Sequence, residues 1–158
     1  MKLYHGTTSV FTEIDLAKSN SAKDFGRGFY LSADRAQAEN WAKFKSVQTG
    51  EAALVMEFDF DESVLERADL AIARFESYTE QWARFVLENR NNLSGENSHQ
   101  YDIVVGPIAN DKVGTQIRNY FEGNITFEIL LERLKYMKGI TFQYFFGTPR
   151  AIKHLRRL

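Results

Sequence analysis

The order of strand-like and helix-like segments constrains the fold of this chain more than any other feature of the sequence. Short apolar or alternating runs, which are typical of strands, occur at 1–6, 29–31, 54–60, 101–106 and 141–146. Helical periodicity or capping signals mark 32–46, 77–91, a segment around Val113 that ends at Gly123, 126–138 and a short segment after Thr148. These segments do not alternate regularly as strand and helix, and no glycine-rich phosphate turn is present. The sequence therefore predicts an α+β fold and argues against a Rossmann fold.

The helix expected at 32–46 bears on both the fold and the site. Ser32 has the residue type that favours the N-cap position. Ala38, Trp41 and Ala42 follow at helical spacing, so we expect them to form one buried stripe.

Length and composition exclude several classes of protein and site. The chain has 158 residues, 44% hydrophobic and 26% charged, as expected for one domain spanning 1–158. It has no cysteine, which excludes disulfides and cysteine-based metal sites. His5, His99 and His154 lack metal-ligand spacing, so no metal site is expected. No segment has the pattern of a membrane span or signal peptide, and we expect a soluble, cytoplasmic protein that does not bind membranes.

Charge is balanced overall but uneven along the chain. The formal net charge is −1, so no global field attracts nucleic acid or an anionic membrane. Acidic residues dominate 51–76, whereas 133–158 contains basic residues and no acidic one. We expect the basic segment to be either a solvated helix at a positive end of the molecule or a surface that attracts a polyanion.

Three short segments are candidates for a functional site. They are Tyr4-His5-Gly6-Thr7-Thr8, the segment DFGRGFYLS from Asp24 to Ser32, and Phe142-Gln143-Tyr144-Phe145. Taken singly, each has a structural explanation: a turn, a loop with aromatic anchors, and an aromatic core strand. Tyr30 alternates with its strand neighbours and should therefore face away from them, as a residue in a cleft must.

In this order the segments resemble the H-Y-E type of ADP-ribosyltransferase, which includes the diphtheria-toxin-like and poly(ADP-ribose)-polymerase-like catalytic domains. In those families a first strand carries His-Gly, and a later strand carries Gly-x-Tyr. A helix then bears a second aromatic residue eleven positions after that tyrosine, and a late strand carries a catalytic Glu. Here His5-Gly6, Gly28-Phe29-Tyr30 and Trp41 fit the first elements. Most of the chain is also similar to a small bacterial family of uncharacterised, ADP-ribosyltransferase-like proteins (DUF3990-like). The resemblance implies a split, mixed β-sheet core with surrounding helices.

The resemblance further implies that the protein binds NAD as a co-substrate. Tyr30 and Trp41 would hold the nicotinamide ring between two aromatic faces, which suits a planar pyridinium. Stacking needs the Tyr30 ring and not its hydroxyl, so the sequence predicts that phenylalanine can replace it.

The other cofactor contacts also follow from the resemblance. Gly6, which has no Cβ, would let the main chain reach the nicotinamide carboxamide. His5 would hydrogen-bond the adenine-side ribose, with Thr7 beside it. The polar segment 19–28, which we expect to be a flexible loop ending at Gly28, would lie over the dinucleotide and become ordered by it.

Gln143 is where the chain departs from the family pattern. The Glu of those enzymes binds the nicotinamide-side ribose and favours its positive charge, whereas Gln keeps an acceptor oxygen without the charge. We take His5, Tyr30 and Gln143 as the candidate catalytic residues, and expect single transfer that is slow or depends on a substrate group. Alternatively, Gln143 is an inward-facing amide satisfied by the main chain.

Three functions remain open. The first is a mono-ADP-ribosyltransferase that acts on a protein or nucleic acid, with NAD hydrolysis as a side reaction. A protein of this kind resembles the toxin of a toxin–antitoxin pair, whose partner is a small antitoxin protein. The second is a pseudoenzyme that binds NAD or ADP-ribose. The third is a nucleic-acid-binding protein that uses the basic C-terminus, although no RNP, KH or helix-turn-helix signature occurs.

Overall fold

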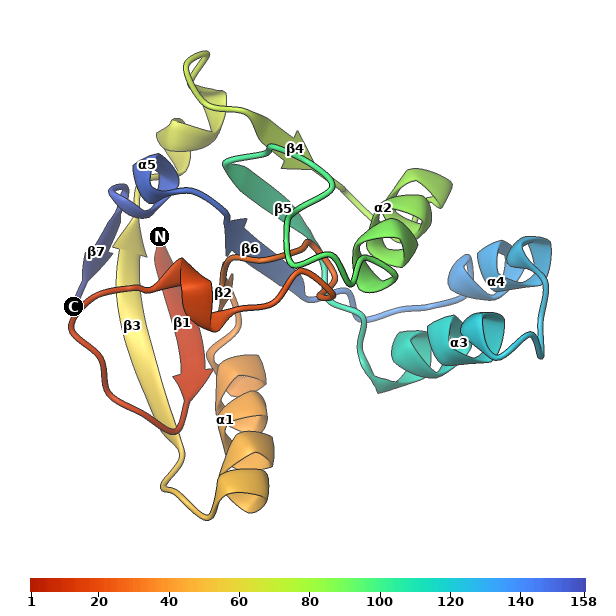
Figure 1. Ribbon diagram of the computed structural model, residues 1–158, viewed down its shortest axis with the longest axis horizontal. Coiled ribbons are helices and arrows are strands. Elements are labelled where there is room, and N and C mark those ends of the chain that lie inside the picture. The colour runs from red at the N-terminus through yellow and green to blue at the C-terminus, as the bar shows by residue number, and fades with distance from the viewer.

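A seven-stranded sheet forms the centre of the computed structural model, which describes residues 1–158 (Figure 1). The strands are β1 (Lys2–Thr7), β2 (Phe29–Ser32), β3 (Leu54–Phe60), β4 (Ile72–Arg74), β5 (Ile103–Pro107), β6 (Phe142–Phe146) and β7 (Leu155–Arg157). The helices are α1 (Arg35–Thr49), α2 (Glu80–Arg90), α3 (Asp111–Phe121), α4 (Phe127–Leu134) and α5 (Pro149–Ile152), with short 3-10 helices η1 (Leu16–Lys18) and η2 (Glu62–Glu66).

The sheet is mixed. Its strand order is β4-β5-β6-β2-β1-β3-β7; β4 and β5 run parallel, and all other neighbours are antiparallel. This arrangement confirms the predicted α+β class, because strands and helices are not organised as repeated parallel units.

Each face of the sheet carries its own apolar core, because successive residues of a strand point to opposite faces. Ile103 and Phe146 belong to one core, which η2, α5 and the segment after β1 cover. Val104 and Phe145 belong to the other, which is covered by α2, α3 and α4. Phe29 and Leu31 lie in the first core while Tyr30 packs against the second, so the predicted orientation of Tyr30 is confirmed.

Helix α1 differs from the prediction at its start and on its surface. Asp34 is the N-cap, and Ser32 instead accepts a hydrogen bond from the Asp34 N–H at 3.0 Å. Ala38 and Ala42 are buried as expected, but Trp41 is 50% exposed and stacks on Phe44. The buried stripe is therefore narrower than predicted: Ala38 and Ala42 lie where α1 packs on Gly6 of β1, and Trp41 lies outside it.

The sheet is nearly divided between β1 and β2. β1 pairs with β3 along its whole length but with β2 only at Tyr4 and Ser32. Met1 and Phe60 exchange both main-chain hydrogen bonds, which sets the alternation along β1. Gly6 consequently points its N–H and C=O toward β2, at a position where the two strands are no longer paired.

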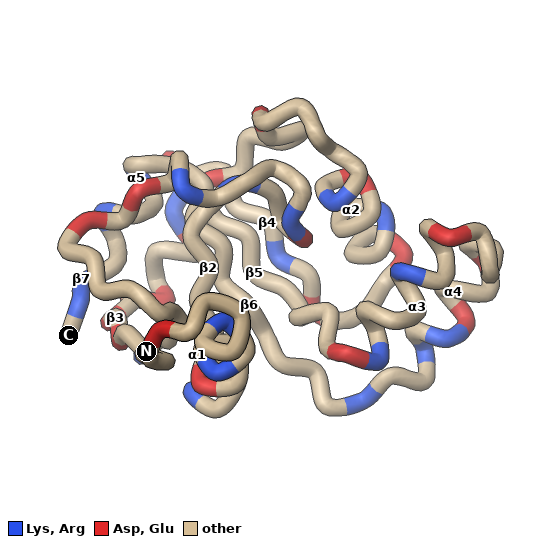
Figure 2. Tube along the Cα trace, turned by 60° about the horizontal axis from the view of Figure 1, so that its bottom comes forward, with Lys and Arg blue, Asp and Glu red and all other residues tan.

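The basic C-terminal segment is not one helix, contrary to one of the expectations. Its residues lie in and just after α4 at one end of the molecule and around α5 and β7 at the other (Figure 1). Figure 2 shows charges of both signs at both ends. Three of the segment's basic residues form ion pairs, Lys135 with Glu132, Arg150 with Asp102 and Arg156 with Asp59.

No helix combines the length and apolar character required to cross a membrane.

Candidate functional site

His5 bridges the division between β1 and β2, which we call the split. Its Nδ1 lies 2.8 Å from the Tyr30 carbonyl oxygen, which can only accept, so Nδ1 carries the proton. The His5 ring packs on Phe29, with ring centroids 4.4 Å apart, and Phe11 meets it edge-on. Nε2 makes no hydrogen bond to the protein, so a neutral His5 presents an acceptor to a ligand.

The protonation of His5 follows from its burial. Burial lowers the pKa of His5 to about 4; the bond to Tyr30 opposes this shift, and the charges of Lys45 and Lys23 add to it. His5 is therefore neutral near pH 7, and its acceptor character does not change through the neutral range.

The two motif glycines are required by close packing. A Cβ on Gly6 would lie 2.1 Å from the carbonyl oxygen of Ala38, because β1 runs directly beneath α1. A Cβ on Gly28 would lie 2.1 Å from the ring of Phe145. Both glycines thus let elements approach at the split, in addition to any role toward a ligand.

Tyr30 uses both its ring and its hydroxyl. The ring packs edge-on against Phe145 and over Phe25, with centroids 5.3 and 6.4 Å away. Its hydroxyl donates to the Gly26 carbonyl at 2.6 Å and accepts from the Phe25 N–H at 3.0 Å. Burial, followed by the charge of Asp24, raises the pKa of Tyr30, so the phenol stays protonated. The hydroxyl therefore anchors the loop before β2, a role that the sequence did not predict.

The segment 19–28 is anchored at several points, which differs from the flexible loop expected. Phe25 is wholly buried, and its carbonyl accepts a hydrogen bond from His99 Nε2 at 2.7 Å. The Asn97 side chain bonds both main-chain groups of Arg27, at 2.6 and 2.9 Å. The segment 92–99 thus holds this loop against the sheet.

Gln143 lies on the same sheet face as Tyr30, in register with Ser32 of β2. Its Nε2 lies 3.4 Å from Asp24 Oδ2 and 3.4 Å from the Pro107 carbonyl oxygen. Arg90 Nε donates to the other Asp24 oxygen at 2.6 Å. The amide is therefore inward-facing, as the alternative interpretation expected, but one of its partners is a carboxylate.

The structure does not bring Trp41 or Thr7 into contact with Tyr30. Trp41 stacks on Phe44 with centroids 5.5 Å apart. The Thr7 hydroxyl bonds locally to Ser9, on the His5 face of β1. His5 and Thr7 thus lie on the opposite sheet face from Tyr30 and Gln143, and the two sets meet only at the split.

Two lysines without acidic partners complete the electrostatics of the site. Lys23 lies 5.5 Å from the centre of the Tyr30 ring, and Lys45 lies 5.6 Å from that of Trp41. Neither forms an ion pair or a hydrogen bond. Burial lowers the pKa of both ammonium groups, and the charge of Lys45 adds to the lowering at Lys23. Their charges also act on His5. The two lysines, which form the rim of the site, therefore favour an anionic ligand.

Sequence reasoning missed Asp24, Lys23 and Lys45 as site residues. Asp24 stands inside a quoted motif, but its partner Gln143 is 119 positions away, and no local pattern connects them. Lys45 stands one turn beyond Ala42 on the helix face that meets Gly6, which is the one signal that could have identified it.

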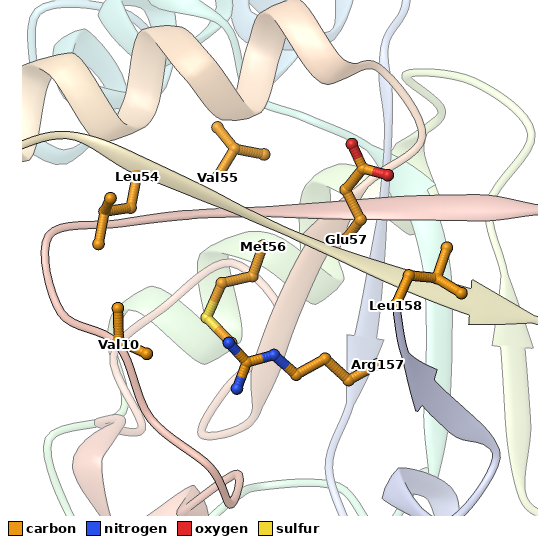
Figure 3. A pocket seen from close by; sticks show the side chains of 7 residues that line it. All are labelled: Val10, Leu54, Val55, Met56, Glu57, Arg157 and Leu158. Carbon is orange, nitrogen blue, oxygen red and sulfur yellow. The ribbon is translucent and has the colours of Figure 1, made fainter.

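A separate hollow lies at the far edge of the sheet. It has a volume of about 340 Å³ and is bounded by β3, β7 and Val10, with the Arg157 side chain beside Met56 (Figure 3). None of the predicted site residues lines it. No group of three or more His, Asp and Glu side chains is placed to hold a metal ion.

Comparison with known proteins gives one family. A family model described as "Protein of unknown function (DUF3990)" matches residues 1–157. No curated protein and no solved structure matches the chain.

Proposed function

The chain belongs to the DUF3990 family, and because that description names no activity, we propose from the site itself that the protein binds NAD at the β1–β2 split and transfers its ADP-ribose. The geometry of the split supports this proposal. Gly6 directs its N–H and C=O into the split, where β1 and β2 are not paired, and these groups suit a carboxamide that both donates and accepts hydrogen bonds. His5 offers Nε2 to a ribose hydroxyl, and the bond to Tyr30 holds its ring in place.

Charge at the rim supports a dinucleotide over a neutral ligand. Lys23 and Lys45 have no acidic partner, and the pyrophosphate of NAD carries two negative charges. A nicotinamide ring would replace the Lys23 ammonium over Tyr30, one cationic group exchanging for another.

The reaction class follows from the bound group. Breaking the bond between ribose and nicotinamide leaves a ribosyl cation, which a nucleophile of a macromolecular acceptor captures; water gives hydrolysis. The acceptor is a protein or nucleic acid, the setting is the cytoplasm of a bacterial cell, and a small antitoxin protein is the partner we propose for a toxin of this kind.

A non-catalytic NAD or ADP-ribose-binding protein is the second candidate. The neutral amide of Gln143 favours it, because an amide contributes no charge to stabilise the ribosyl cation. The two candidates bind the same ligand and differ only in turnover.

Calorimetric titration with NAD, ADP-ribose and nicotinamide, together with an assay of nicotinamide release, tests both. Wild type is expected to bind NAD, and labelled NAD is expected to modify a component of a cell lysate. Tyr30→Ala should abolish binding, whereas Tyr136→Ala, a matched change at an exposed tyrosine after α4, should leave it intact. A folded Tyr30→Ala protein with unchanged affinity would place the ligand elsewhere.

A further inference from the structure

We propose that Asp24 supplies the negative charge that Gln143 lacks, so that the two side chains act together on the nicotinamide-side ribose of NAD. This inference rests on the proposed function. It assigns the hydroxyl contact to Gln143 and the stabilisation of the ribosyl cation to Asp24.

The hydrogen bonds of Gln143 define its orientation. Its two neighbours, the Asp24 carboxylate and the Pro107 carbonyl, are both acceptors, so the NH₂ group must face them. The amide oxygen accepts no hydrogen bond from the protein and is not a fully buried, unpaired atom. It is therefore available to a ribose hydroxyl.

The same geometry explains why a glutamate is absent at this position. A carboxylate at 143 would face the Asp24 carboxylate at about the same 3.4 Å and would direct lone pairs at the Pro107 oxygen. Two like charges this close cannot both be accommodated at low cost. The neutral residue at position 143 and the acid at position 24 are thus complementary: the negative charge lies on the loop before β2 and not on β6.

Asp24 is held firmly enough to serve as a fixed charge. Its side chain is 17% exposed, and Arg90 of α2 holds one oxygen at 2.6 Å while the other faces Gln143. Its charge helps to raise the pKa of the Tyr30 phenol, and the charge of Arg90 opposes part of that shift. Arg90 is a positioning residue, because its bond selects which Asp24 oxygen faces the amide.

The reaction balances without a further reactant. The C1′–N bond of NAD breaks, both electrons stay with the nitrogen, and nicotinamide leaves as a neutral molecule. The ribose carbon gains positive charge, which the Asp24 carboxylate stabilises, and water or the acceptor nucleophile then forms the new bond and releases a proton to solvent. Asp24 changes neither its bonding nor its oxidation state.

A charge-exchange experiment tests the assignment. Nicotinamide release, NAD affinity and circular dichroism are measured for wild type, Asp24→Asn and the double variant Asp24→Asn/Gln143→Glu. Glu96→Gln removes one charge from the neighbouring loop as a control. Asp24→Asn should lower kcat at least about tenfold while the Kd for NAD changes less than about threefold. The double variant should regain most of the lost kcat, and Glu96→Gln should match wild type.

Each outcome is decisive. Wild-type kcat in folded Asp24→Asn, or a double variant no better than Asp24→Asn, overturns the inference while leaving the proposed function standing. Binding of NAD by wild type without turnover overturns it in favour of the non-catalytic protein. Absence of NAD binding removes the proposed function and this inference together. If Asp24→Asn fails to fold because Arg90 loses its partner, Asp24→Asn/Arg90→Gln removes the whole pair, and the same loss of kcat is expected there.

Discussion

Folding changes the protonation of the His5 side chain in the acid range. Its pKa is about 4 in the folded protein and about 6.5 in an unfolded chain. Between these values the unfolded chain binds a proton that the folded one excludes, so stability rises with pH from about 4 to about 6.5 and is complete above that range. The difference corresponds to about 3 kcal/mol.

Urea unfolding at pH 4.5 and pH 7 measures this contribution. Wild type should lose more stability between the two pH values than His5→Gln, because glutamine binds no proton. His154→Gln is the control, since His154 lies near the C-terminus away from the split. Equal pH dependence in wild type and His5→Gln would show that His5 is more hydrated than its surroundings indicate.

The Tyr30 hydroxyl is one of several groups that hold the loop before β2. Tyr30→Phe keeps the ring but leaves the Phe25 N–H and the Gly26 carbonyl without their partner. We expect a loss of about 1–3 kcal/mol in the free energy of unfolding, and faster hydrogen exchange in 24–28. NAD affinity should fall less than in Tyr30→Ala. Unchanged exchange in this loop would mean that Asn97 and His99 suffice to hold it.

Strand periodicity accounts for the elements that could be predicted. The alternation in 54–60 correctly indicated β3, and the place of Tyr30 between two apolar neighbours indicated its opposite face. β4 and β7 have three residues each, which is too short for any period to appear. The exposure of Trp41 was missed because helical spacing tells which residues share a face but not how wide the contact is.

The site itself was only partly predictable. His5 lies on β1, Gly28 immediately precedes β2, and Tyr30 lies on β2. Their proximity follows because these two strands are neighbours both in the sequence and in the sheet. The contact between Asp24 and Gln143 depends on where a loop comes to rest over a strand far along the chain, and tertiary packing alone decides that.

Asp102 connects several parts of the molecule away from the split. It is fully buried and accepts hydrogen bonds from Arg150, Thr148 and the Ala71 N–H. Burial alone would raise the pKa of Asp102, but these hydrogen bonds hold that pKa below its usual value. Asp102→Asn should lower the free energy of unfolding by about 2–3 kcal/mol, because an amide must place donors where Arg150 already donates.

Thermal or urea unfolding of Asp102→Asn checks this, with NAD affinity measured alongside and expected to match wild type. Asp59→Asn is the paired control, since its bridge to Arg156 is exposed and should contribute less than about 1 kcal/mol. Equal effects of the two substitutions would contradict a structural role for the buried carboxylate.

The pairing of β2 with β6 also has a kinetic consequence. The strands on either side of the split find partners far along the chain, and Asp24 and Gln143 are 119 positions apart. Chain entropy must be lost before such pairings become favourable, whereas the neighbouring helices α3 and α4 need only local contacts. A refolding chain will therefore regain helical signal before it regains the ability to hold a ligand, and the split is completed only when β6 docks beside β2.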